Sequence, residues 1–210
     1  MTHDPLPSDV LERLERAEQL KLNGEYAEAL VILEELLLED PENISALEEI
    51  ADNELSLQRY DRAETAAKQA VGLDDGSYTG HYILGFLASR AEDWEHASFH
   101  LRRANTLKPN NPEILRCLGW ALFNADQRVQ GVVTLERALN LDGESTLILC
   151  DLGVAYLQVQ HTEKARLLFL RALDLDPQNE RAQECLQAMK RMKGSAVGGR
   201  QAVVRQNARR

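Results

Sequence analysis

Two histidines, His96 and His100, stand four residues apart, so on a helix they would share one face and could bind one metal ion. The sequence around them supplies neither a third ligand nor an HExxH pattern, and we therefore expect no metal site. The three cysteines, Cys117, Cys150 and Cys185, have no CxxC spacing and no evident histidine partner. No glycine-rich phosphate loop and no GxSxG segment occurs. These residue types predict a protein without catalytic residues, metal or cofactor, and not an enzyme.

The composition is that of a helical chain. Leu, Ala and Glu dominate, and aromatic residues make up only 5% of the sequence, which favours an all-α class. An odd number of cysteines argues against a disulfide framework and fits a reducing compartment. The first residues, MTHDPLPSDV, lack the basic and apolar regions of a secretory signal, and no stretch approaches the roughly 20 apolar residues of a membrane span. We expect a cytoplasmic protein with no membrane span.

Charge is distributed unevenly along the chain. The formal net charge is −10, yet the residues from Lys190 to the end include basic side chains and no acidic ones. An acidic body repels nucleic acid, so we expect no nucleic-acid partner except through this end of the chain. Residues 194–210 combine Gly, Ser and Arg with little apolar periodicity, which predicts a basic disordered tail.

The elements that position these residues are repeats. Segments beginning at residues 24, 58, 92, 126 and 160 align without a gap, each 34 residues after the one before. Each unit carries small residues that would let two helices of a hairpin approach closely, such as Gly153 and Ala165 in the last unit. Pro41, Pro109 and Pro177 stand where a helix must end. The period defines units one to five at 10–43, 44–77, 78–111, 112–145 and 146–179.

The units resemble the tetratricopeptide repeat (TPR) family, whose pattern is W-x2-L-G-x2-Y followed by A-x3-F, A and P. Unit five matches this pattern best, through Leu152, Gly153, Tyr156, Ala165, Phe169, Ala172 and Pro177. The resemblance covers residues 10–179 and implies a right-handed α-solenoid of five helix hairpins. It also implies that the first helix of each unit lines a concave face that binds another protein.

The remaining segments and two unusual residues carry their own expectations. We expect an N-terminal extension over residues 1–9 and a capping helix over 180–193, in which Ala182, Leu186 and Met189 would face unit five. Gly131 stands where Ala is usual, and because glycine in a helix costs roughly 0.5–1 kcal/mol relative to Ala, unit four should be the softer joint. Glu54 replaces a large apolar residue and fits only a solvated edge of the groove.

The concave positions of the family, carried onto this sequence, predict a partner-binding groove that is aromatic in units three and four. Aromatic anchors commonly supply most of a peptide's binding energy. Two alternatives stay open: the superhelix turns some rings into the core, or the capping helix covers the apolar end of the groove. The carboxylate clamp of one TPR subfamily is absent, because its positions hold Leu14, Glu18, Glu49, Thr79 and Ile83. The predicted groove residues are Tyr82, Phe86, Arg90, Arg116, Trp120, Phe123, Asn124, Val154, Leu157 and Gln158.

These features predict an adaptor or assembly scaffold that holds an apolar or basic segment of a partner protein in the concave groove. A dedicated chaperone for a secreted or translocated protein is one alternative. A regulatory subunit of an enzyme complex is another. Self-association also fits, because an exposed groove can accept a second copy of the chain.

Overall fold

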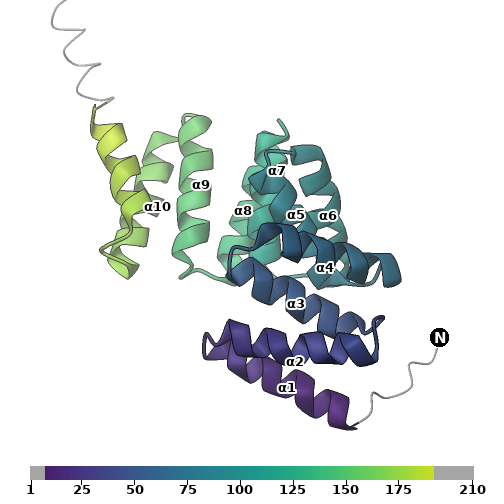
Figure 1. Cartoon of the computed structure of the whole chain (residues 1–210). Coiled ribbons are helices and arrows are strands. Elements are labelled where there is room, and N and C mark those ends of the chain that lie inside the picture. Colours follow the sequence, from purple (N-terminus) through teal and green to yellow (C-terminus); the bar gives the residue numbers. More distant parts are fainter. Residues whose placement is uncertain (1–7, 192–210) are drawn as a thin grey trace, which may run out of the picture.

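The structure is a computed structural model that describes residues 8–191, and every regular element within this range is a helix (Figure 1). The predicted all-α solenoid is confirmed. Ser8 and Asp9, which we expected in the N-terminal extension, belong to the first helix. Residues 1–7 of that extension, residues 192–193 of the capping helix and the predicted tail 194–210 lie outside the described residues. The helices are α1 (Ser8–Leu22), α2 (Tyr26–Glu39), α3 (Ile44–Ser56), α4 (Tyr60–Leu73), α5 (Tyr78–Arg90), α6 (Trp94–Leu107), α7 (Pro112–Asn124), α8 (Arg128–Leu141), α9 (Thr146–Gln158), α10 (Thr162–Leu175) and a C-terminal helix over 180–191.

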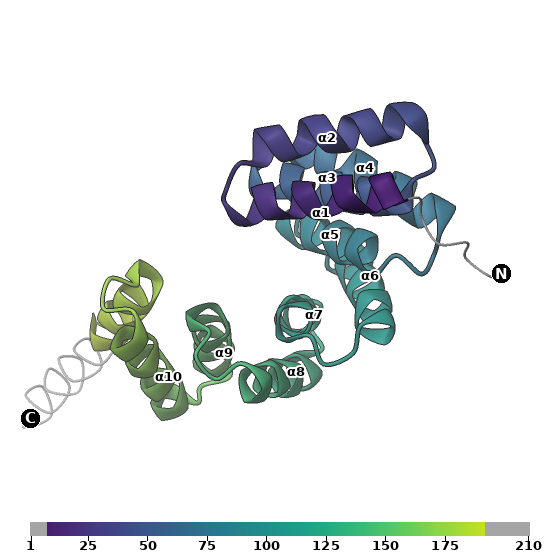
Figure 2. The same cartoon turned by 90° about the horizontal axis from the view of Figure 1, so that it is seen from below.

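The helices follow one another along an arc (Figure 2). The odd-numbered helices, here called first helices, pack on one another in the series α1, α3, α5, α7 and α9. The even-numbered second helices contact only their neighbours in the chain among the labelled helices, and not one another. The first helices therefore lie closer to one another than the second helices do, and this curves the solenoid. Figure 2 shows α7 and α9 on the inner side of the arc with α8 and α10 outside them.

A polar cap at the same place in every unit fixes where the next helix begins. The side chains of Asn43, Ser77, Asn111 and Ser145 each accept a hydrogen bond from the backbone N–H three residues further on, at the start of α3, α5, α7 and α9. Asn179 caps the C-terminal helix in the same way, at 3.0 Å. The five caps are spaced by 34 residues, so the start signal repeats with the sequence period.

Glycine allows the two helices of unit four to touch backbone to backbone. A Cβ atom at Gly131 of α8 would lie 2.6 Å from the backbone nitrogen of Phe123 and 2.7 Å from the carbonyl oxygen of Gly119, both in α7. The reason for our expectation, that Gly131 merely weakens its helix, is therefore wrong, and a softer unit four stays an untested prediction. Helix propensity describes an isolated helix, whereas at this crossing only glycine leaves room for the neighbouring backbone.

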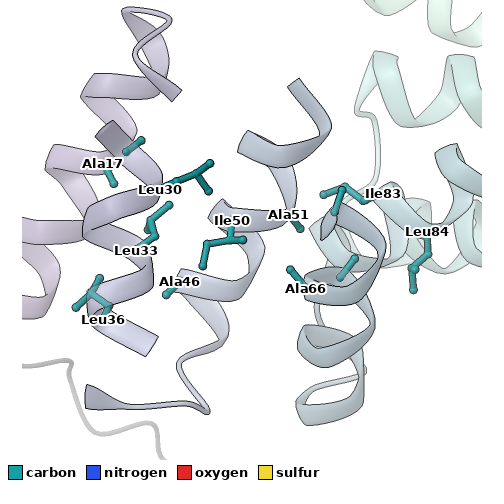
Figure 3. Close-up of a cluster of buried hydrophobic side chains, with 13 residues drawn as sticks. Ala17, Leu30, Leu33, Leu36, Ala46, Ile50, Ala51, Ala66, Ile83 and Leu84 are labelled. Atoms are coloured by element: carbon teal, nitrogen blue, oxygen red, sulfur yellow. The ribbon is translucent and has the colours of Figure 1, made fainter. Parts of the chain in front are cut away.

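Glu54 is fully buried, at 0% exposure, and the expectation that it lies at a solvated groove edge is wrong. It belongs to α3, which contributes Ala46, Ile50 and Ala51 to the apolar cluster that joins α1 to α5 (Figure 3). Two arginines compensate its charge, Arg62 at 3.0 Å and Arg59 at 3.4 Å. Arg62 also reaches Glu34 of α2 at 2.6 Å, so the buried carboxylate takes part in an ion-pair network across units one and two.

The C-terminal helix packs on unit five as predicted. Ala182 and Met189 are buried, at 0% and 4% exposure, in a cluster that includes Phe169 of α10, and Leu186 is partly buried against the same cluster. This helix therefore covers apolar surface at the end of the solenoid. Among residues 8–191, no helix combines the length and hydropathy needed to cross a membrane.

Candidate partner-binding face

A row of hydrogen bonds and ion pairs links α5, α7 and α9 to the C-terminal helix. Tyr82 donates its hydroxyl hydrogen to Glu113 Oε1 at 3.1 Å, and Arg116 Nε donates to Glu113 Oε2 at 2.8 Å. Arg116 Nη1 donates to Asp151 Oδ2 at 2.7 Å, and Arg181 Nη1 donates to the other oxygen of this carboxylate at 2.6 Å. We call these five residues the polar ladder. Its two carboxylates face two guanidinium groups, so it carries no net charge.

The partners within the polar ladder keep Glu113 and Arg116 ionised. Burial alone would raise the pKa of Glu113, but the hydrogen bond and positive charge of Arg116 lower this pKa below its usual range. Burial alone would lower the pKa of Arg116, but Glu113 and Asp151 raise it. Burial raises the pKa of Tyr82, which keeps the phenol protonated. Arg116 is thus committed to two carboxylates, with 15% of its side chain exposed, and does not offer a spare charge to a ligand carboxylate.

Three aromatic side chains lie beside the polar ladder. Tyr82 and Phe86 of α5 have ring centroids 6.5 Å apart. Trp120 of α7 has the guanidinium carbon of Arg181 at 5.8 Å from its ring centroid, within the range of a cation–π contact. All three rings are partly exposed. They leave apolar surface for a partner on both sides of the boundary between units three and four.

Phe123 does not belong to this surface, and its assignment to the groove is wrong. Its side chain is only 2% exposed and lies in the buried cluster that contains Leu135 of α8 and Leu149 of α9. Its backbone is also the closest neighbour of Gly131. Because α8 approaches this end of α7 so closely, the Phe123 ring is enclosed, although it stacks on Trp120 with centroids 6.4 Å apart.

The other polar residues of the predicted groove are spread over separate places. Arg90 stacks on the ring of Tyr60 in α4, with its guanidinium carbon 4.1 Å from the ring centroid, and so turns toward unit two rather than toward the ladder. Asn124 donates from Nδ2 to the backbone oxygen of Trp120 at 2.8 Å. Gln158 is exposed at the end of α9. Only Asn124 is in contact with a residue of the aromatic group.

Val154 and Leu157 are partly buried against the cluster that includes Ala182 and Met189 of the C-terminal helix. They agree with the alternative in which the capping helix covers the apolar end of the groove. Among the predicted groove residues, the partly exposed aromatic side chains outside this cluster are therefore Tyr82, Phe86 and Trp120.

Asp151 and Arg181 belong to this face, although neither was predicted from the sequence. A signal was present, because Asp151 is the single charged residue in α9, TLILCDLGVAYLQ. A charged side chain within an apolar helix requires a partner, since an isolated buried charge is costly. Arg181 could not be identified as one of its partners from the sequence, because it lies in the C-terminal helix, outside the five units.

The histidines that could have shared a metal have other partners. His96 Nδ1 lies 2.7 Å from Asp93 Oδ2, and His100 Nδ1 lies 3.0 Å from Nδ1 of the buried His81. Burial lowers the pKa of His100, and the charges of His81 and His96 lower it further. Among residues 8–191, no group of three or more His, Cys, Asp or Glu side chains could hold a metal ion.

The cysteines should differ strongly in reactivity. Burial raises the pKa of Cys117 to about 12 and that of Cys150 to about 11. Because the thiolate is the reactive species, we expect iodoacetamide at pH 8 to label Cys185, which is partly exposed, first and the other two at least about 100-fold more slowly than in the unfolded chain. Peptide mass spectrometry over a time course measures these rates, with guanidinium chloride as the unfolded control. Equal labelling of Cys117 and Cys185 in the native protein would contradict the described burial.

Models of the tetratricopeptide repeat family match residues 20–78 and residues 146–179. A curated relative, anaphase-promoting complex subunit 3 from Schizosaccharomyces pombe, is 24% identical over 126 residues. That alignment covers 60% of this chain and 19% of the relative, so the chain spans about a fifth of the relative's length.

Two solved structures extend the likeness along the chain. The Cut9–Hcn1 hetero-tetramer of the anaphase-promoting complex aligns with a TM-score of 0.76 and 18% identity, over 88% of this chain and 37% of that one. YrrB, described as a TPR protein with an unusual peptide-binding site, aligns with a TM-score of 0.65 and 20% identity, over 83% of this chain and 90% of that one. At these identities the structural likeness establishes the fold alone.

Proposed function

The chain is a tetratricopeptide repeat protein, and from this premise we propose that it binds a segment of a partner protein on the inner side of units three to five. The fold is that of a protein–protein interaction scaffold, because stacked repeats create extended surfaces rather than catalytic pockets. The proposed role is that of an adaptor or assembly factor. Phe86 and Trp120 are the apolar anchors in this proposal, and the polar ladder is the frame that holds their helices in register.

The observation that carries this proposal is the position of Trp120. This large ring remains partly exposed on the inner helix α7, while its neighbour Phe123 is enclosed. Arg181 lies against one side of the ring and holds it through the C-terminal helix. A large ring already ordered by its surroundings loses little conformational entropy when a partner covers it, which favours its use as an anchor.

The chemistry of the face also indicates the kind of segment it would bind. The polar ladder has no net charge, and its arginines are already paired with Asp151. A ligand carboxylate would therefore have to displace an existing ion pair. An apolar segment, with basic residues that can approach the exposed part of Glu113, is the better match.

Replacing Trp120 with Ala tests the face. We expect Trp120→Ala to weaken capture of the partner about 10- to 30-fold, because truncating a central aromatic anchor costs on the order of 1.4–2 kcal/mol. The measurement is quantitative affinity capture from the native cell with isotope-labelled wild type and variant. Circular dichroism establishes that the variant is folded.

Phe99→Ala is the matched control, since it also removes one aromatic ring but from α6, where Phe99 is 63% exposed. Partners that are lost with Trp120→Ala and retained with Phe99→Ala are ligands of the inner face. If Trp120→Ala, alone and combined with Phe86→Ala, leaves every partner's recovery unchanged, the assignment of the face is wrong.

A second candidate function is a subunit of a multi-protein enzyme assembly. It is favoured by the likeness in sequence to a subunit of the anaphase-promoting complex, which is 24% identical over 126 residues. Size-exclusion chromatography of the native cell extract distinguishes the two candidates. A subunit elutes in a stable large complex, whereas an adaptor for transient segments elutes near the size of the free chain.

A further inference from the structure

A cavity of about 600 Å³ opens between α4, α5 and α6, and no residue of the polar ladder lines it. Its walls are mainly apolar and its rim carries ionisable groups. A smaller cavity of about 260 Å³ adjoins it and shares Glu64, Leu87 and Ala91 with it. The lining of the larger cavity includes Val71, Leu84, Leu87, Ala88, His96 and His100 from the three helices.

Because the chain repeats every 34 residues, this cavity can be compared with the equivalent place in another unit. A second cavity, of about 470 Å³, lies between α8, α9 and α10, two units further along. Seven of its lining residues are the equivalents, 68 residues later, of residues that line the first cavity. The two cavities are therefore the same place in units three and five, lined by different side chains.

In unit five the chain itself places a phenol there. Tyr156 is 7% exposed, and its hydroxyl donates a hydrogen bond to Glu136. Lys164 Nζ lies 3.4 Å from this hydroxyl and 4.8 Å from the ring centroid. The phenol thus has an apolar enclosure for its ring, a carboxylate to accept its hydrogen and an ammonium group to donate to its oxygen.

In unit three the equivalent of Tyr156 is Ala88, which leaves the space of the ring unfilled. The other units have larger side chains at this position, Leu20, Glu54 and Leu122. Side chains that can form hydrogen bonds nevertheless lie around Ala88. Lys68 stands at the position of Glu136 and has the Glu64 carboxylate 2.7 Å away, which provides one donor and one acceptor side by side.

His96 stands at the position of Lys164 in this cavity. Its Nδ1 is held by Asp93 at 2.7 Å, so Nε2 is the ring nitrogen that can serve another group. In unit five, Glu136 and Lys164 contact the Tyr156 hydroxyl. In unit three, Lys68 and His96 occupy these two positions, and both can form a hydrogen bond with a hydroxyl. The charge pattern, a carboxylate beside an ammonium group, is complementary to a phenol in both units.

We propose that the cavity around Ala88 is a receptor for a tyrosine side chain supplied by another protein. The tyrosine ring enters between Val71 and Leu84, and its hydroxyl meets Lys68 and His96. The adjoining cavity, beside Tyr60 and Arg90, accommodates the residues that flank this tyrosine. This binding site is separate from the inner face, so Trp120→Ala leaves it intact.

The tyrosine side-chain analogue p-cresol is the probe for this proposal. We expect p-cresol to cause saturable shifts of the His96 and His100 ring resonances in NMR spectra of the full chain. Toluene, which lacks the hydroxyl, should bind about 3- to 10-fold more weakly, because it cannot form the hydrogen bonds of the phenol. N-acetyl-tyrosinamide should bind as well, since it represents tyrosine within a chain.

Two substitutions test the comparison between units three and five, one by filling the cavity around Ala88 and the other by removing the Tyr156 ring. Ala88→Tyr supplies the ring from within, as unit five does, and should weaken p-cresol binding at least about 10-fold by occupying its place. Tyr156→Ala should create a second p-cresol site in unit five, so that p-cresol raises the melting temperature of this variant more than that of the wild type.

Several results would overturn the proposal. The proposal is wrong if p-cresol does not bind the wild type saturably, or if Ala88→Tyr does not weaken that binding. It is also wrong if toluene binds as tightly as p-cresol, or if N-acetyl-tyrosinamide does not bind. If Ala88→Tyr does not fold, the double variant Lys68→Met, His96→Ala decides instead, because both side chains lie at the rim. It should abolish the preference for p-cresol over toluene, and a retained preference contradicts the assigned hydroxyl partners.

Discussion

Gly131→Ala should lower the free energy of unfolding by about 3 kcal/mol, at the upper end of the range for overpacked sites. The added Cβ would stand 2.6 Å from the backbone nitrogen of Phe123 and 2.7 Å from its Cα. Backbone atoms cannot rotate away as the end of a side chain can, so α7 and α8 must separate. Separation would open the crossing at Gly119 and expose the enclosed ring of Phe123, which adds lost burial to the strain.

Gly72→Ala is the matched control, because a Cβ at this position near the end of α4 would have no atom within 4 Å beyond its chain neighbours and the backbone of its own helix. It should raise stability by about 0.5–1 kcal/mol, the usual gain when alanine replaces a helical glycine in open space. Thermal and urea unfolding of both variants measure whether each substitution raises or lowers the free energy of unfolding. Hydrogen exchange shows whether the Gly131→Ala effect is confined to α7 and α8, as expected for a repeat array with nearest-neighbour coupling. A Gly131→Ala protein as stable as the wild type would refute the close crossing.

The all-α solenoid could be predicted because its signals are local and repeat every 34 residues. Each first helix after α1 begins directly after a capping side chain, such as Asn43 or Ser145, and each position of the repeat reports the same environment in every unit. A single unusual residue in one unit therefore does not hide the repeat. Misjudging Gly131 or Glu54 did not change the predicted class of fold.

The candidate face could be predicted only in part, because it depends on contacts between units. Trp120 and Phe123 occupy the same helix, and position alone assigned both to the groove. Which ring stays exposed is decided by how closely α8 approaches, and that distance depends on Gly131 in a different helix. The partners of Glu54 were missed for the same reason, since Arg62 reaches it from the following helix.

Asp151→Asn should lower the free energy of unfolding by about 2 kcal/mol, below the roughly 3–5 kcal/mol of a fully buried broken ion pair because Arg181 is partly hydrated. The Asp151 side chain is 4% exposed and lies between Arg116 at 2.7 Å and Arg181 at 2.6 Å. Asn keeps the shape but removes the charge, which leaves two guanidinium groups facing one neutral amide. Asp126→Asn, at a side chain that is 91% exposed, should leave the unfolding midpoint unchanged.

The consequences of Asp151→Asn should extend beyond global stability, because Asp151 is the residue that joins the C-terminal helix to the polar ladder. Releasing Arg181 removes its contact with Trp120, so hydrogen exchange should accelerate in residues 180–191 and Trp120 fluorescence should change. Arg181→Gln added to Asp151→Asn should cost little more than Asp151→Asn alone, since the pair is already broken. Additive costs in this double-mutant cycle would mean that the two side chains act independently, and that the ladder does not couple the capping helix to the partner-binding face. A measured coupling would instead make the C-terminal helix a determinant of how firmly Trp120 is held for a partner.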